Sequence, residues 1–331
     1  MPQLSAGPLG RIHIKIQAKL KESFLEDSVN VDYAIPHRVS RTLLVVSGIS
    51  ILILWPLAAV ILFRGNTLGL AISLFASGIG QGPFLTGYAF ARADHKQWWR
   101  WLVLAASGLG ILLFSLVDAV NLDIDGFFEV LILVTIAPAF GHTMITTVIG
   151  PLIFGQVLCG WGCWRAMVLE RLPVGKGSGR RKGVWVWMPL VGVAVSFAVA
   201  ILFVLVPDSQ PGGAHGHIHG NSFWPVASGV AVYYTASITL ALALHDQRAF
   251  CKYLCPTGFI LRWTSRPAIL HVSARADACN ECEACTAVCP MDIPVAEHAR
   301  MGTNIGKGDC ILCQRCVESC PTGALKTIFK K

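Results

Sequence analysis

Charged side chains are scarce in this sequence, and their scarcity excludes an ordinary water-soluble protein. Only 14% of the 331 residues are charged, whereas a soluble globular domain has about 25%. Apolar residues make up 54% of the chain, and the mean hydropathy is +0.58. The composition therefore predicts an integral membrane protein.

Several common cofactor motifs are also missing. The sequence has no P-loop and no dinucleotide-binding fingerprint, because the glycines around Gly177 lie in a basic linker with no strand before them. It has no C-x-x-C-H motif for covalent haem. All 12 cysteines fall into four motifs, and none stands alone. Any redox chemistry is therefore expected from iron–sulfur clusters and thiols.

The sequence contains several long apolar runs that are nearly free of charged residues. A bilayer core is ~30 Å thick, and a helix needs about 20 apolar residues to span it. We count six such runs, near residues 43–63, 68–91, 101–118, 127–150, 184–206 and 225–244. Six transmembrane helices are therefore expected.

Lys and Arg are distributed unevenly around these runs. Of the 27 basic residues, all but Arg64 lie before the first run, after the last, or between the second and third or the fourth and fifth. Because basic residues are retained in cytoplasmic loops, both termini are expected in the cytoplasm. This topology also accounts for the net charge of +8, so no nucleic-acid partner is expected.

Eight cysteines lie in the polar C-terminal part of the chain, in CNECEACTAVCP and CILCQRCVESCP. Each run is C-x2-C-x2-C-x3-C-P, the bacterial ferredoxin pattern in which the fourth cysteine ligates the other of two clusters. Structural zinc fits less well, because its Cys pairs are usually a dozen or more residues apart, and disulfides are rare in the cytoplasm. Two [4Fe-4S] clusters are expected, one held by Cys279, Cys282, Cys285 and Cys320, the other by Cys310, Cys313, Cys316 and Cys289.

The remaining four cysteines form two C-x3-C pairs, each following an apolar run. They are Cys159 and Cys163 in CGWGC, and Cys251 and Cys255 in CKYLC, so equivalent cysteines are 92 residues apart. We interpret this as an internal repeat whose halves face each other across a pseudo-twofold axis. Spacing i, i+4 places the two sulfurs of each pair on one face of a helix. The four thiols are expected to converge at the cytoplasmic membrane surface, beside the ferredoxin domain.

The residue types at these pairs leave the chemistry open. Buried cysteines can be apolar filler. The alternatives are a third iron–sulfur cluster, a redox-active thiol site, or a site for copper or another metal. Spacing alone does not decide among them.

The expected fold class is an all-α integral membrane domain of about six transmembrane helices, joined to a small α+β bacterial-type 2[4Fe-4S] ferredoxin domain. Three parts are expected: a cytoplasmic N-terminal segment (1–42), the membrane domain with both C-x3-C motifs (43–267), and the cytoplasmic ferredoxin domain (268–331).

The combination of span-end CGWxC, span-end C-x3-CPTG and two ferredoxin runs resembles a known family over roughly residues 127–331. It is similar to the NapH/MauN-type membrane polyferredoxins and to the membrane half of the nitrous-oxide-reductase maturation protein NosR. It also resembles CcoG, the copper-reducing assembly factor of cbb3-type cytochrome oxidase. The chain differs in having Trp164 where the family usually continues with proline, and in two additional N-terminal spans.

The resemblance implies a membrane-bound electron-transfer protein of the cytoplasmic (inner) membrane. It would pass electrons between the quinone pool or a cytoplasmic donor and a respiratory or periplasmic redox partner, with quinol dehydrogenase activity as one form. The alternative is a cupric reductase or an assembly factor of a respiratory metalloenzyme.

Four histidines are further candidates. His215, His217 and His219 alternate in the last extracytoplasmic loop and suit copper, zinc or nickel, although glycine-rich loops also carry polar residues without function. His142 lies inside the fourth apolar run, where an ionisable residue is a functional-site hypothesis. It would donate to a quinone or relay a proton, or else be a hydrogen-bonded core residue.

Overall fold

The computed structural model describes residues 37–64, 68–118, 121–132, 144–177, 179–205, 223–305 and 308–329. The chain divides into two compact units, Met1–Thr42 and Leu43–Lys331. Of the first unit, the described part is the beginning of a helix at residues 37–42. The second unit contains both the long apolar helices and the cysteine-rich C-terminal region, and the boundary expected near residue 267 stays a prediction.

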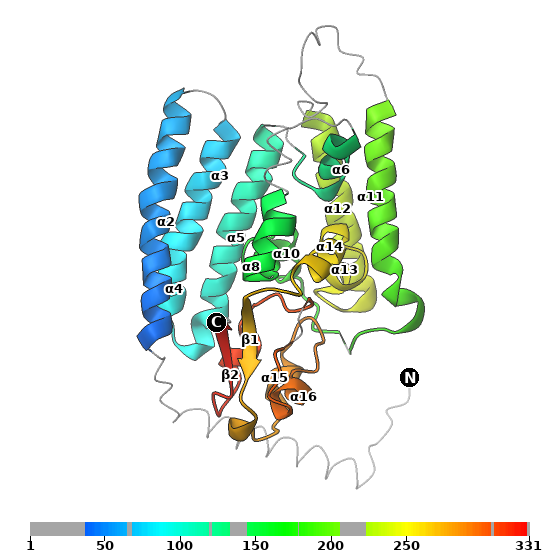
Figure 1. Ribbon diagram of the computed structural model, residues 1–331. Coiled ribbons are helices and arrows are strands. Elements are labelled where there is room, and N and C mark those ends of the chain that lie inside the picture. Colours follow the sequence, from blue (N-terminus) through cyan, green and yellow to red (C-terminus); the bar gives the residue numbers. More distant parts are fainter. Residues whose placement is uncertain are drawn as a thin grey trace, which may run out of the picture. The chain divides into compact units, whose positions relative to one another are not determined.

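The chain is mainly helical, as the apolar runs predict (Figure 1). The first half contains α2 (His37–Arg64), α3 (Leu68–Ile79), the π-helix η1 (Gly80–Phe84), α4 (Leu85–Phe90), α5 (Ala93–Val117) and α6 (Ile124–Ile132). The middle contains the π-helix η2 (Met144–Ile149), α8 (Gly150–Phe154), α9 (Val157–Trp161), α10 (Trp164–Leu169), η3 (Gly183–Val186) and α11 (Met188–Leu205). The remaining helices are α12 (Phe223–Leu244), α13 (Ala249–Tyr253), α14 (Pro256–Thr264), η4 (Ala276–Ala278), α15 (Ala284–Ala287), α16 (Val295–Arg300) and α17 (Arg315–Glu318).

Two helices among the described residues are long and apolar enough to cross a membrane, Ala93–Val117 and Val226–Leu244. A third is counted if Met144–Phe154 and Val157–Leu169 form one span, although they meet at a bend of 99°. Ser47–Ile61 and Met188–Leu202 are shorter apolar helices. The apolar runs therefore correctly predicted membrane helices, while the number six stays a prediction. Part of the fourth run lies outside the described residues.

The second predicted run is interrupted where Pro83 stands inside the π-helix η1. Proline has no N–H to donate and clashes with the preceding turn. Next to the proline, two hydroxyls hydrogen-bond the backbone, because Ser47 Oγ and Thr86 Oγ1 donate to the carbonyl of Gly82 at 2.8 and 2.9 Å. Neighbouring side chains commonly satisfy the backbone in this way within apolar surroundings.

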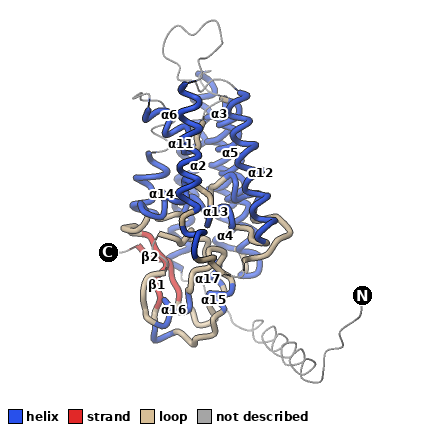
Figure 2. Tube along the Cα trace, turned by 90° about the vertical axis from the view of Figure 1, so that its right-hand side faces the viewer, coloured by secondary structure: helices blue, strands red, loops and turns tan. Residues whose placement is uncertain are grey.

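The C-terminal region is closed by a two-stranded antiparallel sheet. β1 (Leu270–Ala274) pairs with β2 (Leu325–Phe329), and Leu270 lies opposite Phe329. One strand precedes the first cysteine run and the other follows the second, so the pairing holds both runs in one core. Figures 1 and 2 show this sheet and the short helices α15 and α16 at one end of the long helices α5 and α12.

Candidate iron–sulfur and thiol site

The two ferredoxin runs fold into loops with the same backbone conformation. In the first run Glu281 and Glu283 both have φ of 59°, and in the second the equivalent Leu312 and Gln314 have 53° and 65°. Residues other than glycine rarely adopt this left-handed conformation. When it alternates with right-handed residues, successive N–H groups turn inward and form the anion-binding concavities found at many iron–sulfur sites.

Each loop lines a cavity that also receives the fourth cysteine of the other run. We call the two cavities the outer site and the inner site. The outer site is lined by Cys279, Cys282, Cys285 and Cys320. The inner site is lined by Cys289, Cys310, Cys313 and Cys316. These groups match the two predicted ligand sets, and four thiols fit the ligand requirement of a [4Fe-4S] cluster.

The thiols influence one another within these sets. Burial raises the pKa of Cys316, and the charges of Cys310, Cys313 and Cys289 raise it further. A smaller contribution comes from Cys285 of the outer site, so the two sites adjoin. Burial also raises the pKa of Cys310 to about 12. Such a thiol keeps its proton at neutral pH, and iron binding must release that proton.

The outer site is more accessible than the inner one. Cys282 is exposed, and the flanking Glu281 and Glu283 side chains are 64% and 68% exposed. Three of the four inner-site cysteines are buried, and apolar residues such as Val272 and Ile293 line the rest of that cavity. The outer site therefore faces solvent, whereas the inner site faces the protein interior.

The two C-x3-C pairs share one local structure. In each, a five-residue helix ends before the second cysteine, at Gly162 (φ −146°) or Leu254 (φ −132°). The second cysteine is extended and caps the next helix, with ψ of 121° at Cys163 and 113° at Cys255. The prediction that the two sulfurs of each pair lie on one face of a helix is therefore wrong, because the helix ends between them. In the second pair Pro256 disfavours helical backbone at the residue before it.

Two buried arginines connect the halves of this repeat. Arg165, from the first half, has its Nη1 atom 3.9 Å from the Sγ of Cys255 in the second. Arg248, from the second half, donates to the carbonyl of Cys159 at 3.2 Å and lies 3.8 Å from the Sγ of Cys251. The charge of Cys163 also acts on Cys255. The structure thus brings together four cysteines from distant parts of the chain, which we call the cysteine quartet (Cys159, Cys163, Cys251 and Cys255).

Burial suppresses the ionisation of two quartet thiols, Cys251 and Cys255. The pKa of Cys255 is raised to about 12, mainly by burial. The positive charge of Arg165 opposes this shift, and the charges of Cys251 and Cys163 add to it. Burial also raises the pKa of Cys251, although Arg248 opposes the shift. Buried thiols of this kind are inert while protonated. The two arginines supply the positive charge that thiolate ligands need once a proton is lost.

The quartet packs directly on the inner site. Cys159 contacts the hydrophobic core that surrounds the inner-site cysteines. Gly160 lies so close that a Cβ added there would fall 2.2 Å from the carbonyl oxygen of Ile311. Trp161 Nε1 donates to the carbonyl of Leu312 at 2.9 Å. The three sites are therefore arranged in the order quartet, inner site and outer site.

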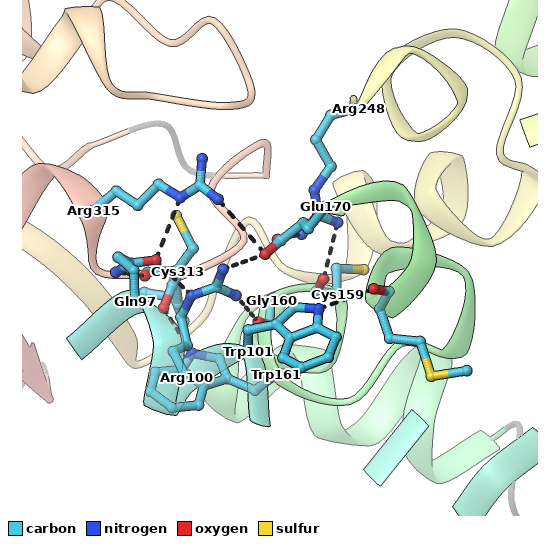
Figure 3. Close-up of polar contacts among 12 residues, drawn as sticks. Gln97, Arg100, Trp101, Cys159, Gly160, Trp161, Glu170, Arg248, Cys313 and Arg315 are labelled. Atoms are coloured by element: carbon cyan, nitrogen blue, oxygen red, sulfur yellow. Dashed lines mark hydrogen bonds and ion pairs between the residues drawn. The ribbon is translucent and has the colours of Figure 1, made fainter. Parts of the chain in front are cut away.

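A single buried carboxylate joins the quartet, helix α5 and the inner-site loop (Figure 3). Glu170 pairs with Arg100 and Arg248, and its Oε2 lies 3.6 Å from Nη2 of Arg315. Burial acts to raise the pKa of Glu170, but the charges of Arg248 and Arg100 lower it to about 2. Glu170 is therefore ionised at neutral pH. We call these four residues the Glu170 network.

A second buried charge cluster lies nearby. Lys252 is fully buried, and its Nζ is 2.6 Å from Asp246 and 2.5 Å from Asp292. Asp292 belongs to the segment just after the first ferredoxin run. This cluster also attaches the ferredoxin region to the helices that carry the quartet. Among the described residues, the recorded partners of Lys252 Nζ are the two carboxylates and no cysteine sulfur.

These charged groups are candidate functional residues that the sequence analysis did not single out. In the sequence, Arg100, Arg165 and Arg248 look like ordinary cytoplasmic positive charge. Their only local signal is position: Arg165 follows Cys163 by two residues, and Arg248 precedes Cys251 by three.

The remaining metal-site candidates fall elsewhere. Within the described ranges, which include the cysteine quartet, no group of three or more His, Cys, Asp or Glu side chains is arranged to hold a single metal ion. The four histidine candidates, His142, His215, His217 and His219, lie outside the described residues.

Comparison with known proteins identifies the C-terminal region. A family model described as a 4Fe-4S dicluster domain matches residues 278–325, which contain both ferredoxin runs. The match supports bound 4Fe-4S clusters and a ferredoxin domain at this end of the chain.

Longer similarities extend into the membrane region. The chain is 24% identical to the putative electron transport protein YccM of Escherichia coli, over 56% of this chain and 54% of that protein. It is 25% identical to the uncharacterized protein MJ0749 of Methanocaldococcus jannaschii, over 63% and 79% respectively. It is 24% identical to the nitrogen fixation protein FixG of Rhizobium meliloti, over 55% and 39%. No solved structure matches.

These relatives support a broad likeness to membrane-type ferredoxin proteins. The narrower resemblance to NapH, MauN and NosR stays a prediction. The chain spans about half of the Escherichia coli relative and less of the Rhizobium one.

Proposed function

We propose that this protein is a multi-pass membrane electron-transfer protein that exchanges electrons between a soluble partner and the quinone pool. The observation that carries the proposal is the row of three cysteine sites. The outer site reaches solvent at Cys282, the inner site adjoins it, and the quartet packs on the inner site from the side of the apolar helices.

The proposed ligands are the predicted ones. The outer site would hold one [4Fe-4S] cluster through Cys279, Cys282, Cys285 and Cys320, and the inner site another through Cys310, Cys313, Cys316 and Cys289. Such clusters, when bound, accept and release single electrons over a wide range of potentials. Left-handed residues at equivalent positions of both loops are typical of the backbone concavities that hold anions at iron–sulfur sites, and the lining of the inner site is largely apolar.

The relatives support the electron-transfer part of this proposal. One of them is named as a putative electron transport protein, and its similarity extends over 56% of this chain. We further propose six spans with both termini and the ferredoxin domain in the cytoplasm, on the distribution of Lys and Arg. A hydrocarbon core of ~30 Å then separates the three sites from the far side, and a diffusible quinone would cover that distance.

A second candidate function is reduction of cupric ion. It is favoured by the quartet, because soft thiolate ligands select Cu(I) and the quartet lies directly beside the inner site. In this case electrons from the clusters would reduce Cu(II) to Cu(I), one electron per ion, and the protein would serve the assembly of a respiratory metalloenzyme.

The test begins with iron and acid-labile sulfide on the anaerobically purified full-length protein. About eight iron atoms per chain are expected from the two ferredoxin sites, at four per cluster. About twelve, falling to eight in the double variant Cys159→Ser and Cys251→Ser, would show a third cluster at the quartet. A chain without iron would overturn the proposal.

The choice between the two functions needs a second measurement. The dithionite-reduced protein is mixed with a short-chain quinone or with cupric ion, and cluster reoxidation is followed by absorbance. Faster reoxidation by quinone supports the first function. Faster reoxidation by copper that is lost in Cys159→Ser supports the second.

A further inference from the structure

The Glu170 network has an unusual balance of charge. Three guanidinium groups surround one carboxylate, and the Arg100 and Arg248 side chains are each only 1% exposed. Desolvating charged groups costs free energy that their pairing only partly returns. A second carboxylate, Glu318, does not join Glu170, since Tyr88 and Gln97 hydrogen-bond it at 2.7 and 2.6 Å.

Each arginine of the network comes from a different part of the fold (Figure 3). Arg100 belongs to α5 and donates to the carbonyl of Gly160 at 2.6 Å. Arg248 precedes α13 and contacts the quartet. Arg315 belongs to the second ferredoxin run, immediately before Cys316. Glu170 is thus the one described group in contact with all three.

Arg315 links the Glu170 network to the inner site, because it lies on the inner-site loop. Its Nε atom donates to Gln97 Oε1 at 3.3 Å, and Gln97 Nε2 donates to the carbonyl of Cys313 at 3.2 Å. The guanidinium is therefore held beside the loop by two partners, Gln97 and Glu170. At the outer site the recorded ion pairs are different, with Arg300 facing Glu281 and Glu283.

Charges near a cluster set its reduction potential, because the reduced form carries one more negative charge. A nearby arginine stabilises the reduced form and raises the potential, whereas a nearby carboxylate lowers it. Coulombic effects of this kind are strong where water is excluded, as it is around Glu170.

We propose that Glu170 sets the reduction potential of the inner site relative to the outer site, by offsetting the positive charge of Arg100, Arg248 and Arg315. Glu170 touches no cluster ligand and acts through the charge of the network. The inference rests on the proposed iron–sulfur function, since it requires a cluster at the inner site.

The experiment is a redox titration of the full-length protein in detergent, with both clusters followed by EPR. The outer cluster is assigned as the signal that disappears in Cys282→Ser. In Glu170→Gln the inner cluster is expected to become easier to reduce by at least tenfold in equilibrium constant, which is about 59 mV for one electron. The outer cluster is expected to change less than twofold.

A second variant tests the sign. Arg315→Gln removes a positive charge from the same network, so the inner cluster should become harder to reduce. The Arg315 side chain is 27% exposed, and its replacement is expected to leave the fold intact even if Glu170→Gln does not fold. Glu283→Gln is the control, because it removes a carboxylate that is 68% exposed and lies beside the outer site, and it should leave the inner cluster within twofold.

The possible outcomes distinguish failure of this inference from failure of the proposed function. A wild-type protein without clusters would overturn the proposed function. Clusters that are present but unmoved in both variants would overturn the inference alone. So would a shift of the same sign in both variants, or an equal shift of the outer cluster.

Discussion

The outer and inner sites have the same motif and the same loop conformation, yet their surroundings differ. The outer loop carries exposed acidic side chains at Glu281 and Glu283. The equivalent positions of the inner loop are Leu312 and Gln314, and this loop is contacted by Gly160 and Trp161, which lie between two cysteines of the quartet. The motif therefore specifies the ligands of both sites, whereas the neighbouring helices leave the outer site at the surface and bury the inner one.

The largest effect is expected from removing one cysteine ligand of either site, because the cluster at that site should then be lost. Cys316→Ser is expected to reduce the iron content from about eight to about four atoms per chain and to abolish electron transfer from a soluble viologen donor to quinone. Cys282→Ser should cause a similar loss of iron. Equal retention of all iron in both variants would contradict the assignment of ligands.

The second largest effect is expected on thermal stability, from disturbing the close contact at Gly160. In Gly160→Ala the new methyl group would fall 2.2 Å from a backbone oxygen, so the quartet and the inner loop must move apart. Overpacking of this kind costs about 1–3 kcal/mol, and a lower thermal unfolding midpoint is expected.

The control for that substitution is Gly229→Ala, where nothing lies within 4 Å of the added Cβ. Gly229 lies inside α12, and alanine in a helix interior is not destabilising. An equal fall in the midpoint for both variants would show that the contact between Gly160 and the inner loop has no special importance.

The hydrogen bond from Trp161 should have an intermediate effect. Trp161→Phe removes the indole donor to the Leu312 carbonyl, which keeps a second donor in Gln314 Nε2 at 3.1 Å. The loss is therefore expected to cost about 0.5–1.5 kcal/mol, the net value of one hydrogen bond. The inner cluster should then lose iron to a chelator faster, while the outer cluster is unchanged. Trp263→Phe, at a residue that is 54% exposed, serves as the comparison and should leave both rates unaltered.

The smallest effect is expected at the surface of the outer site. Arg300 pairs with Glu283 at 2.9 Å, but both side chains are largely exposed, and such ion pairs contribute less than about 1 kcal/mol. Arg300→Ala should therefore change the unfolding midpoint very little. A large drop would mean that the outer site is held by its surface charges in the same way as the inner site is held by buried ones.

Much of the site follows from sequence spacing. Three cysteines separated by two residues must lie in one short loop, so the ferredoxin runs predict ligand sets that coincide with the linings of two cavities. The two C-x3-C pairs predict a repeat, and the equivalent backbone breaks before Cys163 and Cys255 are consistent with it. The prediction that the two sulfurs of each pair share one helix face was wrong, because the helices end at Trp161 and Tyr253, before the second cysteine.

The sequence by itself determined the apolar helices, the four cysteine motifs and the iron–sulfur character of the C-terminal region, because each depends on residues that are close along the chain. Only the tertiary structure decided which charges surround those motifs. Glu170 and Arg248 are 78 residues apart, and no local pattern distinguishes them from other cytoplasmic charges. Their partners are chosen when the two halves of the repeat and the second ferredoxin loop pack together, since a buried charge must then pair with whatever opposite charge the fold brings within reach.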